Sequence, residues 1–145
     1  MQAGMNYEQK YNYCVNLCTG NSDYGRMLQQ ESDNTTPQTE TCDYSDVSAA
    51  EAFNLIETGD VFILDVRTQS EYDDGHLENS YLIPVSELEN RLDEVPSDTA
   101  ILVYCRSGRR SVTASNILLD AGYCDVYNME AGFNAWRSGG YPYEE

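Results

Sequence analysis

The segment between residues 100 and 122 most constrains how this chain can fold. An apolar run, Ala100–Tyr104, is typical of a short buried strand and ends directly before Cys105. A helix is expected over Ser111–Ala121, with Gly122 as its stop. Cys105 is therefore expected between the carboxyl end of a strand and the amino end of a helix. Backbone N–H groups at a helix start have no partner inside the helix, and with the helix dipole they favour an anion.

The loop that follows Cys105 gathers positive charge around the thiol. Three of the chain's seven arginines lie within five residues of it. A thiol in this setting should lose its proton more easily than its reference pKa of about 8.5 implies. A buried core thiol is the competing interpretation, but it requires neither three guanidinium groups nor a glycine. The sequence thus predicts an anion-binding site with Cys105 as nucleophile and with the binding residues Arg106, Ser107, Gly108, Arg109 and Arg110.

From Tyr44 onward the chain alternates short apolar strands with helices, which predicts an α/β fold. Such alternation implies a parallel sheet, here of about five strands, with helices on both faces. Ligand sites in these sheets lie at the carboxyl ends of the strands, where Cys105 is expected. The expected strands are Val61–Val66, Tyr81–Ile83, Ala100–Tyr104 and Asp125–Met129. Two expected helices follow the capping boxes Ser48–Glu51 (ending at Gly59) and Ser86–Glu89 (ending near Pro96), and further helical segments are expected over Ser70–Asp74, Ser111–Ala121 and Gly132–Arg137.

Residues 1–43 differ in composition from the rest of the chain. They are rich in Asn, Gln, Thr, Ser and Tyr and poor in apolar residues, which predicts an N-terminal extension and linker with one short helix over Tyr7–Leu17. A folded domain is expected over residues 44–145. No stretch is long and apolar enough to span a membrane, and no export signal is recognisable. The pattern is compatible with a cytoplasmic location and with export followed by removal of the signal.

The charge distribution restricts the partners that this chain can bind. The net charge of −17 argues against nucleic acid and against an anionic membrane surface. Lys10 is the only lysine, and positive charge concentrates instead in the loop after Cys105. This placement suits a small anionic substrate.

Three stretches of the chain form a recognisable set. The first runs from Leu64-Asp65-Val66-Arg67 through Glu71-Tyr72 and Gly75-His76-Leu77 to Ile83-Pro84, the second is the loop Cys105–Ser111, and the third is Glu130–Trp136. In this order they resemble a single-domain rhodanese, a sulfurtransferase module, over roughly two thirds of the chain. One departure is Asn79-Ser80, where the family often has Gly-Ala, and it affects a turn more than the chemistry.

The resemblance implies a sulfur transfer in two steps. Cys105 attacks the outer sulfur of an anionic donor such as thiosulfate and becomes a persulfide, and a thiophilic acceptor such as cyanide, a thiol or a protein then takes that sulfur. The backbone amides of residues 106–110 would hold the anionic persulfide. Arg106 matches a cation associated with thiosulfate use, and Arg109 and Arg110 would hold the sulfonate end. No metal and no organic cofactor is implied.

Loop length separates the relatives of this fold. In sulfurtransferases the loop has six residues counted from the cysteine, whereas cell-cycle tyrosine phosphatases and certain arsenate reductases have seven and close the loop with an arginine. Four residues separate Cys105 from Arg110, which fits the smaller ring and a sulfur atom. Two other hypotheses stay open: a sulfur carrier or interaction module with little turnover, and a phosphatase or arsenate reductase.

Asp65, Arg67, Glu71 and His76 are expected to support the site. Arg67 can pair with Asp65 or with Glu71 and so fix a loop near the nucleophile. The resemblance makes His76 a structural histidine before a turn. The aromatic residues of the third stretch, Phe133 and Trp136, are expected in the core.

The remaining cysteines are open to several interpretations. Cys124 leads into a strand and is expected to be a buried thiol. Cys14 and Cys18 share one face of the expected helix. A zinc site there would need two more ligands, of which Cys42 could supply one, and no metal site is predicted. A disulfide involving Cys42 is expected if the protein is exported. In a third interpretation, one of these thiols accepts sulfur from Cys105.

Overall fold

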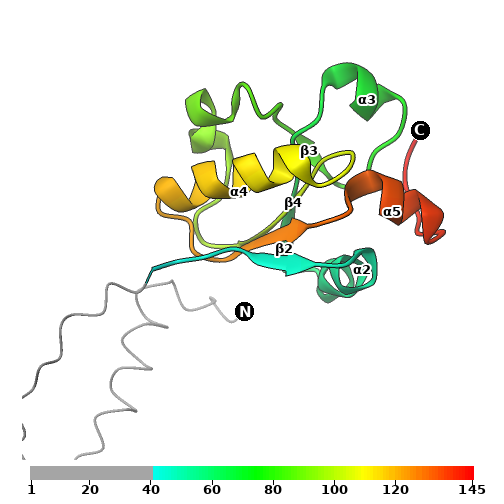
Figure 1. Cartoon of the computed structure of the whole chain (residues 1–145), viewed down its shortest axis with the longest axis horizontal. Coiled ribbons are helices and arrows are strands. Elements are labelled where there is room, and N and C mark those ends of the chain that lie inside the picture. Colours follow the sequence, from blue (N-terminus) through cyan, green and yellow to red (C-terminus); the bar gives the residue numbers. More distant parts are fainter. Residues whose placement is uncertain (1–40) are drawn as a thin grey trace, which may run out of the picture. The chain divides into compact units, whose positions relative to one another are not determined.

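The computed structural model describes residues 41–145, so the helix predicted over residues 7–17 lies outside the described residues. Five parallel strands form one sheet in the order β1-β5-β4-β2-β3 (Figure 1). The strands are β1 (Ser45–Val47), β2 (Val61–Asp65), β3 (Tyr81–Leu82), β4 (Ala100–Tyr104) and β5 (Val126–Met129). The helices are α2 (Ala49–Thr58), α3 (Gln69–Asp73), α4 (Arg109–Asp120) and α5 (Gly132–Ser138), and two 3-10 turns are η2 (Leu88–Asn90) and η3 (Leu92–Glu94).

The apolar strands β2 and β4 lie side by side near the middle of the sheet, with Val61 paired to Ala100 and Leu64 to Val103. A parallel strand in this position is covered on both faces, which explains its unbroken apolar run. Helix α4 covers one face, and α2 and α5 cover the other (Figure 1). The predicted α/β fold with a parallel sheet and helices on both faces is therefore confirmed.

Local sequence signals account for most element boundaries. The Ser48 hydroxyl accepts the Glu51 N–H and the Glu51 carboxylate accepts the Ser48 N–H, so the predicted capping box begins α2. Gly59 ends α2 in the left-handed conformation, as predicted. Strand β1 was not among the predicted elements, because three residues, Ser45–Val47, carry too little pattern to indicate an edge strand.

The prediction of a helix after Ser86 is wrong. The segment forms the two turns η2 and η3, and no side chain caps either of them. Arg91, at their junction, has φ −124° and ψ 21°, which lies outside the helical region and divides the segment. Leu88 and Val95 are nevertheless both buried. The apolar residues of this segment therefore pack into the core although the segment forms no continuous helix.

The prediction of a buried thiol at Cys124 is also wrong. Cys124 is exposed and forms a disulfide with Cys42 across 82 residues of sequence. The bond joins the segment before β1 to the segment before β5, two neighbouring strands of the sheet. Within residues 41–145, no helix has the length and apolar character needed to cross a bilayer.

Candidate active site

Cys105 lies where the central strand β4 meets the first turn of α4. Its side chain is only 1% exposed and forms the floor of the loop over residues 105–110. Gly108 occupies the N-cap position of α4 in the left-handed conformation, and the helix begins at Arg109. The helix start is thus two residues closer to Cys105 than the predicted Ser111, which brings its free N–H groups nearer to the sulfur.

Hydrogen-bond donors of the loop converge on the Cys105 sulfur. The Gly108 N–H donates to Sγ at 3.1 Å, and Ser111 Oγ lies 3.6 Å from Sγ. Burial raises the pKa of the thiol, but the hydrogen bond with the Ser111 hydroxyl and those from the amides of Ser107, Gly108 and Ser111 together lower the pKa further than burial raises it. The pKa of Cys105 consequently lies below its ordinary value. The sulfur is therefore held in an environment that favours a thiolate.

The contribution of Ser111 was missed by sequence reasoning. Its hydroxyl oxygen accepts from the Cys105 thiol, and its hydroxyl hydrogen is donated to the Gly108 carbonyl at 3.0 Å, so Ser111 binds the backbone of the loop as well as the sulfur. The residue is fully buried beneath the loop. Its place in the first turn of the helix, six residues after the cysteine, is the signal that points to such a contact.

The loop rests on the beginning of α5. The Phe133 N–H donates to the Cys105 carbonyl at 2.8 Å, and the Asn134 N–H donates to the Arg106 carbonyl at 3.0 Å. A Cβ on Gly132 would lie 2.5 Å from the Cys105 carbonyl oxygen, so only glycine allows this approach. Helix α5 thus supports the loop from below, through backbone groups that no side-chain pattern reveals.

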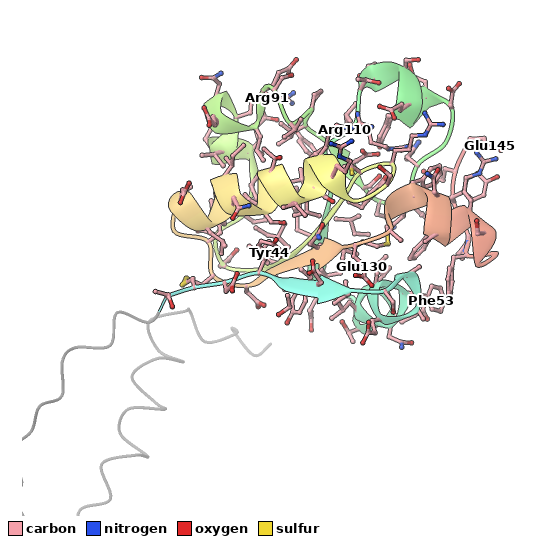
Figure 2. All side chains as sticks on the ribbon, viewed as in Figure 1. Tyr44, Phe53, Arg91, Arg110, Glu130 and Glu145 are labelled. Atoms are coloured by element: carbon pink, nitrogen blue, oxygen red, sulfur yellow. A yellow bond between two sulfur atoms is a disulfide. The ribbon has the colours of Figure 1, made fainter. Side chains whose placement is uncertain are left out.

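The three loop arginines have different surroundings. Arg110, at the amino-terminal end of α4 (Figure 2), donates from both Nη atoms to the Glu71 carboxylate at 2.7 and 2.8 Å. The hydrogen bonds from Arg110, helped by Thr68 and opposed by partial burial, lower the pKa of Glu71 to about 2. Arg106 and Arg109 are exposed, and neither forms an ion pair with any residue from 41 to 145. These two guanidinium groups are available to an anion.

Asp65 and Arg67 form a buried ion pair beside the loop. Arg67 donates from Nε and Nη2 to the Asp65 carboxylate, with the shortest contact at 2.6 Å, and also to the Gly75 carbonyl at 2.7 Å. The Tyr104 hydroxyl donates to the same carboxylate at 2.6 Å. Burial and the Asp65 charge raise the pKa of Tyr104, so it stays a hydrogen-bond donor. Of the two partners considered for Arg67, the structure shows Asp65, while Glu71 binds Arg110.

His76 lies in the turn between α3 and β3. Its ring stacks on Tyr72 with centroids 3.7 Å apart, and its Nδ1 lies 2.9 Å from the Tyr72 carbonyl oxygen. Its Nε2 lies 3.2 Å from a carboxylate oxygen of Glu144, and the two residues also form a backbone bridge. These contacts attach the C-terminal segment, through Glu144, to the turn that contains His76.

The cysteine hypotheses are narrowed by the geometry. Cys42 is bonded to Cys124, and no cluster of metal-binding side chains occurs within the described residues. Cys105 is the one free cysteine of that part of the chain, whereas Cys14 and Cys18 lie outside it. The disulfide precedes β1 and β5, whereas Cys105 follows β4, so they lie at opposite ends of the sheet, a strand length of roughly 16 Å apart. Cys42 and Cys124 are therefore not placed to accept sulfur from Cys105 within one molecule.

Known proteins resemble this chain over most of the described residues. The model of the rhodanese-like domain matches residues 48–139. A sulfurtransferase from Allochromatium vinosum is 36% identical over 88 residues, which cover 61% of this chain and 82% of the relative. Thiosulfate sulfurtransferase GlpE from Coxiella burnetii is 30% identical over 95 residues, which cover 66% of this chain and 89% of the relative. The crystal structure of a rhodanese-related protein from Thermoplasma volcanium has a TM-score of 0.65 and 32% identity, over 70% of this chain and 98% of that one.

These similarities agree with the geometry of the loop. The family match spans more than half of the chain and includes β2, β4, the entire loop and the helix α5 beneath it. The sequence identity between this chain and the solved relative is similar to its identity to the sequence relatives. Fold and sequence therefore point to the same group of proteins. The chain therefore belongs to the family of rhodanese-like domains.

Proposed function

We propose that this protein is a sulfurtransferase that moves sulfane sulfur from thiosulfate or a persulfide donor to a thiophilic acceptor through a persulfide on Cys105. In the first half-reaction the Cys105 thiolate forms a bond to the outer sulfur of thiosulfate. The bond between the two sulfurs of thiosulfate breaks, and sulfite leaves with the electron pair. In the second half-reaction the acceptor attacks the outer sulfur of the persulfide and Cys105 leaves as the thiolate.

The environment of the Cys105 sulfur is the observation that carries this proposal. The Gly108 N–H contacts the sulfur at 3.1 Å, and the net effect of burial and hydrogen bonding lowers the pKa of the thiol. A thiolate is the nucleophilic form of cysteine, and amide donors at the same position also stabilise an anionic persulfide. Relatives named sulfurtransferases support this assignment at the level of the family.

The binding roles of the loop follow from the same arrangement. The amides of residues 106–110 hold the terminal sulfur, while Arg106 and Arg109 bind the sulfonate of the donor. Arg110 is paired with Glu71, so its proposed role is to hold α3 beside the loop. Asp65, Arg67 and His76 support the loop and the neighbouring turn without contacting the donor.

A panel assay on the full chain tests the proposal. Intact mass after thiosulfate treatment is expected to increase by one sulfur atom in the wild type and not in Cys105→Ser. Thiocyanate formation from thiosulfate and cyanide should accompany this gain. If Cys105→Ser still gains the sulfur, Cys105 is not the nucleophile.

The same panel separates the alternative functions. Loading of Cys105 without thiocyanate turnover would favour the carrier hypothesis over the enzyme. Hydrolysis of an aryl phosphate that is lost in Cys105→Ser would favour the phosphatase hypothesis. We expect no such hydrolysis, because the loop over residues 105–110 has six residues, one fewer than the loop of the phosphatases.

A further inference from the structure

The Ser111 hydroxyl has a single hydrogen and two possible acceptors within reach. Its oxygen lies 3.6 Å from Cys105 Sγ and 3.0 Å from the Gly108 carbonyl oxygen. All three residues are buried, so the hydrogen has to be shared inside the protein. While Cys105 is protonated, its S–H donates to the Ser111 oxygen and the hydroxyl hydrogen is donated to the Gly108 carbonyl.

Loss of the thiol proton reverses the contact between Cys105 and Ser111. A thiolate has no hydrogen and can only accept, so the two groups keep a hydrogen bond only if the Ser111 hydroxyl turns its hydrogen toward the sulfur. This turn is a rotation about the Cβ–Oγ bond, and no heavy atom has to move. A hydrogen bond to a charged acceptor is stronger than one between neutral groups, so the thiolate attracts the hydrogen away from the carbonyl.

The Gly108 carbonyl can release the hydroxyl at little cost. It also accepts the Val112 N–H at 3.4 Å, a hydrogen bond at the start of α4. The carbonyl therefore keeps a partner after the Ser111 hydroxyl has turned away, and no buried group is left unpaired. Both positions of the hydroxyl hydrogen are thus compatible with the same backbone.

The charge on the Cys105 sulfur changes twice in the proposed reaction. When the thiolate bonds to the outer sulfur of thiosulfate, the negative charge of the product lies on the terminal sulfur of the persulfide and Sγ becomes neutral. In the second half-reaction the bond between the two sulfurs breaks, and Sγ becomes negative again. A donor aimed at Sγ therefore stabilises the departing thiolate more than the persulfide from which it forms.

We propose that the Ser111 hydroxyl is a catalytic group that turns its hydrogen from the Gly108 carbonyl to Cys105 Sγ as sulfur passes to the acceptor. The inference rests on the proposed sulfurtransferase function. The acceptor forms a bond to the outer sulfur of the persulfide, the bond between that sulfur and Sγ breaks, and Cys105 leaves as the thiolate with the electron pair. The hydroxyl proton stays on its oxygen, so the step consumes no base, oxidant or reductant.

The two half-reactions should depend differently on Ser111. Loading starts from a thiolate that already holds the hydrogen bond, so Ser111 assists this step only by increasing the fraction of thiolate. Transfer starts from a neutral Sγ and develops charge there, so the hydrogen bond strengthens during the step. A residue that merely supports the loop would affect both half-reactions.

Single-turnover rates of the two half-reactions test this role. Full-length protein is loaded with thiosulfate, desalted and mixed with cyanide, and intact mass follows the gain and then the loss of the extra sulfur. In Ser111→Ala the transfer to cyanide should slow about tenfold, the effect of one hydrogen bond to a charged group. Loading measured above the pKa of Cys105 should stay within about twofold of the wild type. That pKa, taken from the pH dependence of iodoacetamide alkylation of the Cys105 peptide, should be higher in the variant.

Ser115→Ala is the matched control. Ser115 lies one turn further along α4 and is as fully buried as Ser111, and its hydroxyl donates to the Ser111 carbonyl at 2.8 Å. The variant removes the same atom from the same helix, but not the one beside the sulfur, so both half-reactions should stay within about twofold of the wild type. Equal slowing of transfer in the two alanine variants would overturn the proposal. Equal slowing of loading and transfer in Ser111→Ala would do the same.

The behaviour of the wild type separates this inference from the proposed function. If the wild type gains no sulfur from thiosulfate or from a persulfide donor, the proposed function fails before any acceptor is added, and the role of Ser111 fails with it. If the wild type and Ser111→Ala load and transfer sulfur at equal rates, the sulfurtransferase function stands and the role of Ser111 is wrong.

Discussion

Gly108 determines how closely the loop of Cys105 can approach Glu130, the residue directly after β5. Its φ of +94° lies in the left-handed region, and a Cβ at this position would overlap the carbonyl of Glu130. The same residue supplies the N–H that contacts the Cys105 sulfur. Gly108 is therefore required for the left-handed backbone conformation and for the close approach to Glu130, and its N–H also binds the sulfur.

Gly108→Ala is expected to destabilise the protein by about 3 kcal/mol, from left-handed strain combined with the overlap at Glu130. The loading of Cys105 by thiosulfate should slow as well, because the Gly108 N–H moves away from the sulfur. Urea unfolding and the loading rate measure the two effects. Gly59→Ala is the control, since Gly59 has φ +78° but nothing within 4 Å of an added Cβ. It should cost about 1 kcal/mol, and equal losses in the two variants would show that the overlap at Glu130 is unimportant.

The ion pair between Glu71 and Arg110 should stabilise the protein in a pH-dependent way. The folded-state pKa of Glu71 is lowered to about 2 from 4.5, so its contribution is complete above the unfolded value and is lost as the pH falls toward 2. Glu71→Gln keeps an acceptor for the Thr68 cap but removes the charge. We expect a loss of about 1 kcal/mol at pH 7, after allowance for solvent screening, which shrinks between pH 5 and pH 2.

Urea unfolding of wild type and Glu71→Gln at several pH values checks this prediction. Glu51→Gln is the control, because Glu51 has the same capping position in α2 and binds only Ser48. Its effect should be smaller than that of Glu71→Gln at pH 7. A stability difference between wild type and Glu71→Gln that persists unchanged to pH 2 would contradict the assigned ion pair.

At the scale of elements, the unit of β4, loop and α4 follows from the sequence. Four residues of the apolar run, Ile101–Tyr104, are buried between two layers of helices, the position that a continuous apolar strand requires. The cysteine after it is held at a helix start, as its position predicts. Strong local signals and long-range packing agree in this unit, so sequence reasoning succeeds there.

Other elements depend on contacts between residues distant in the sequence. Strand β1 is three residues long and is specified by its pairing with β5, not by its own composition. Arg67 had two candidate carboxylates, and only the folded arrangement gives it Asp65 and gives Glu71 to Arg110. The support of the loop by Phe133 and Asn134 uses backbone groups, which no residue pattern displays.

The disulfide is a long-range connection between elements and should add to stability. It closes a loop of 82 residues, and a bond of this span is expected to contribute about 4.5 kcal/mol through the lost entropy of the unfolded chain. Replacing both Cys42 and Cys124 by serine should lower the free energy of unfolding by that amount. Loading of Cys105 should be unchanged, because the disulfide lies at the opposite end of the sheet.

Peptide mapping without reduction provides the structural control for this variant. The wild type should yield a peptide pair linked through Cys42 and Cys124, and the double variant should not. A folded double variant that no longer takes up sulfur would contradict the separation of the disulfide from the site.

At the scale of the whole molecule, two opposing fields act on an anionic donor. The net charge of −17 repels thiosulfate, whereas the unpaired guanidinium groups of Arg106 and Arg109 attract it over a short range. Salt screens both, with a Debye length near 8 Å at about 0.15 M. The direction in which salt changes the loading rate therefore shows whether the repulsion by the net charge or the attraction by the loop arginines is stronger near Cys105.

We expect the rate of Cys105 loading at low thiosulfate to fall as ionic strength rises, because the two arginines lie nearer to the donor than most of the acidic residues. Arg106→Ala and Arg109→Ala should load more slowly at low salt and depend less on salt than the wild type. The pair of Arg110 and Glu71 is electrically neutral as a unit, so the double variant Arg110→Ala/Glu71→Gln should keep the salt dependence of the wild type. Stopped-flow or quenched mass measurements at two salt concentrations give these rates. A wild-type rate that increases with salt would mean that the net charge of the protein outweighs the loop, and that the backbone amides alone bind the donor.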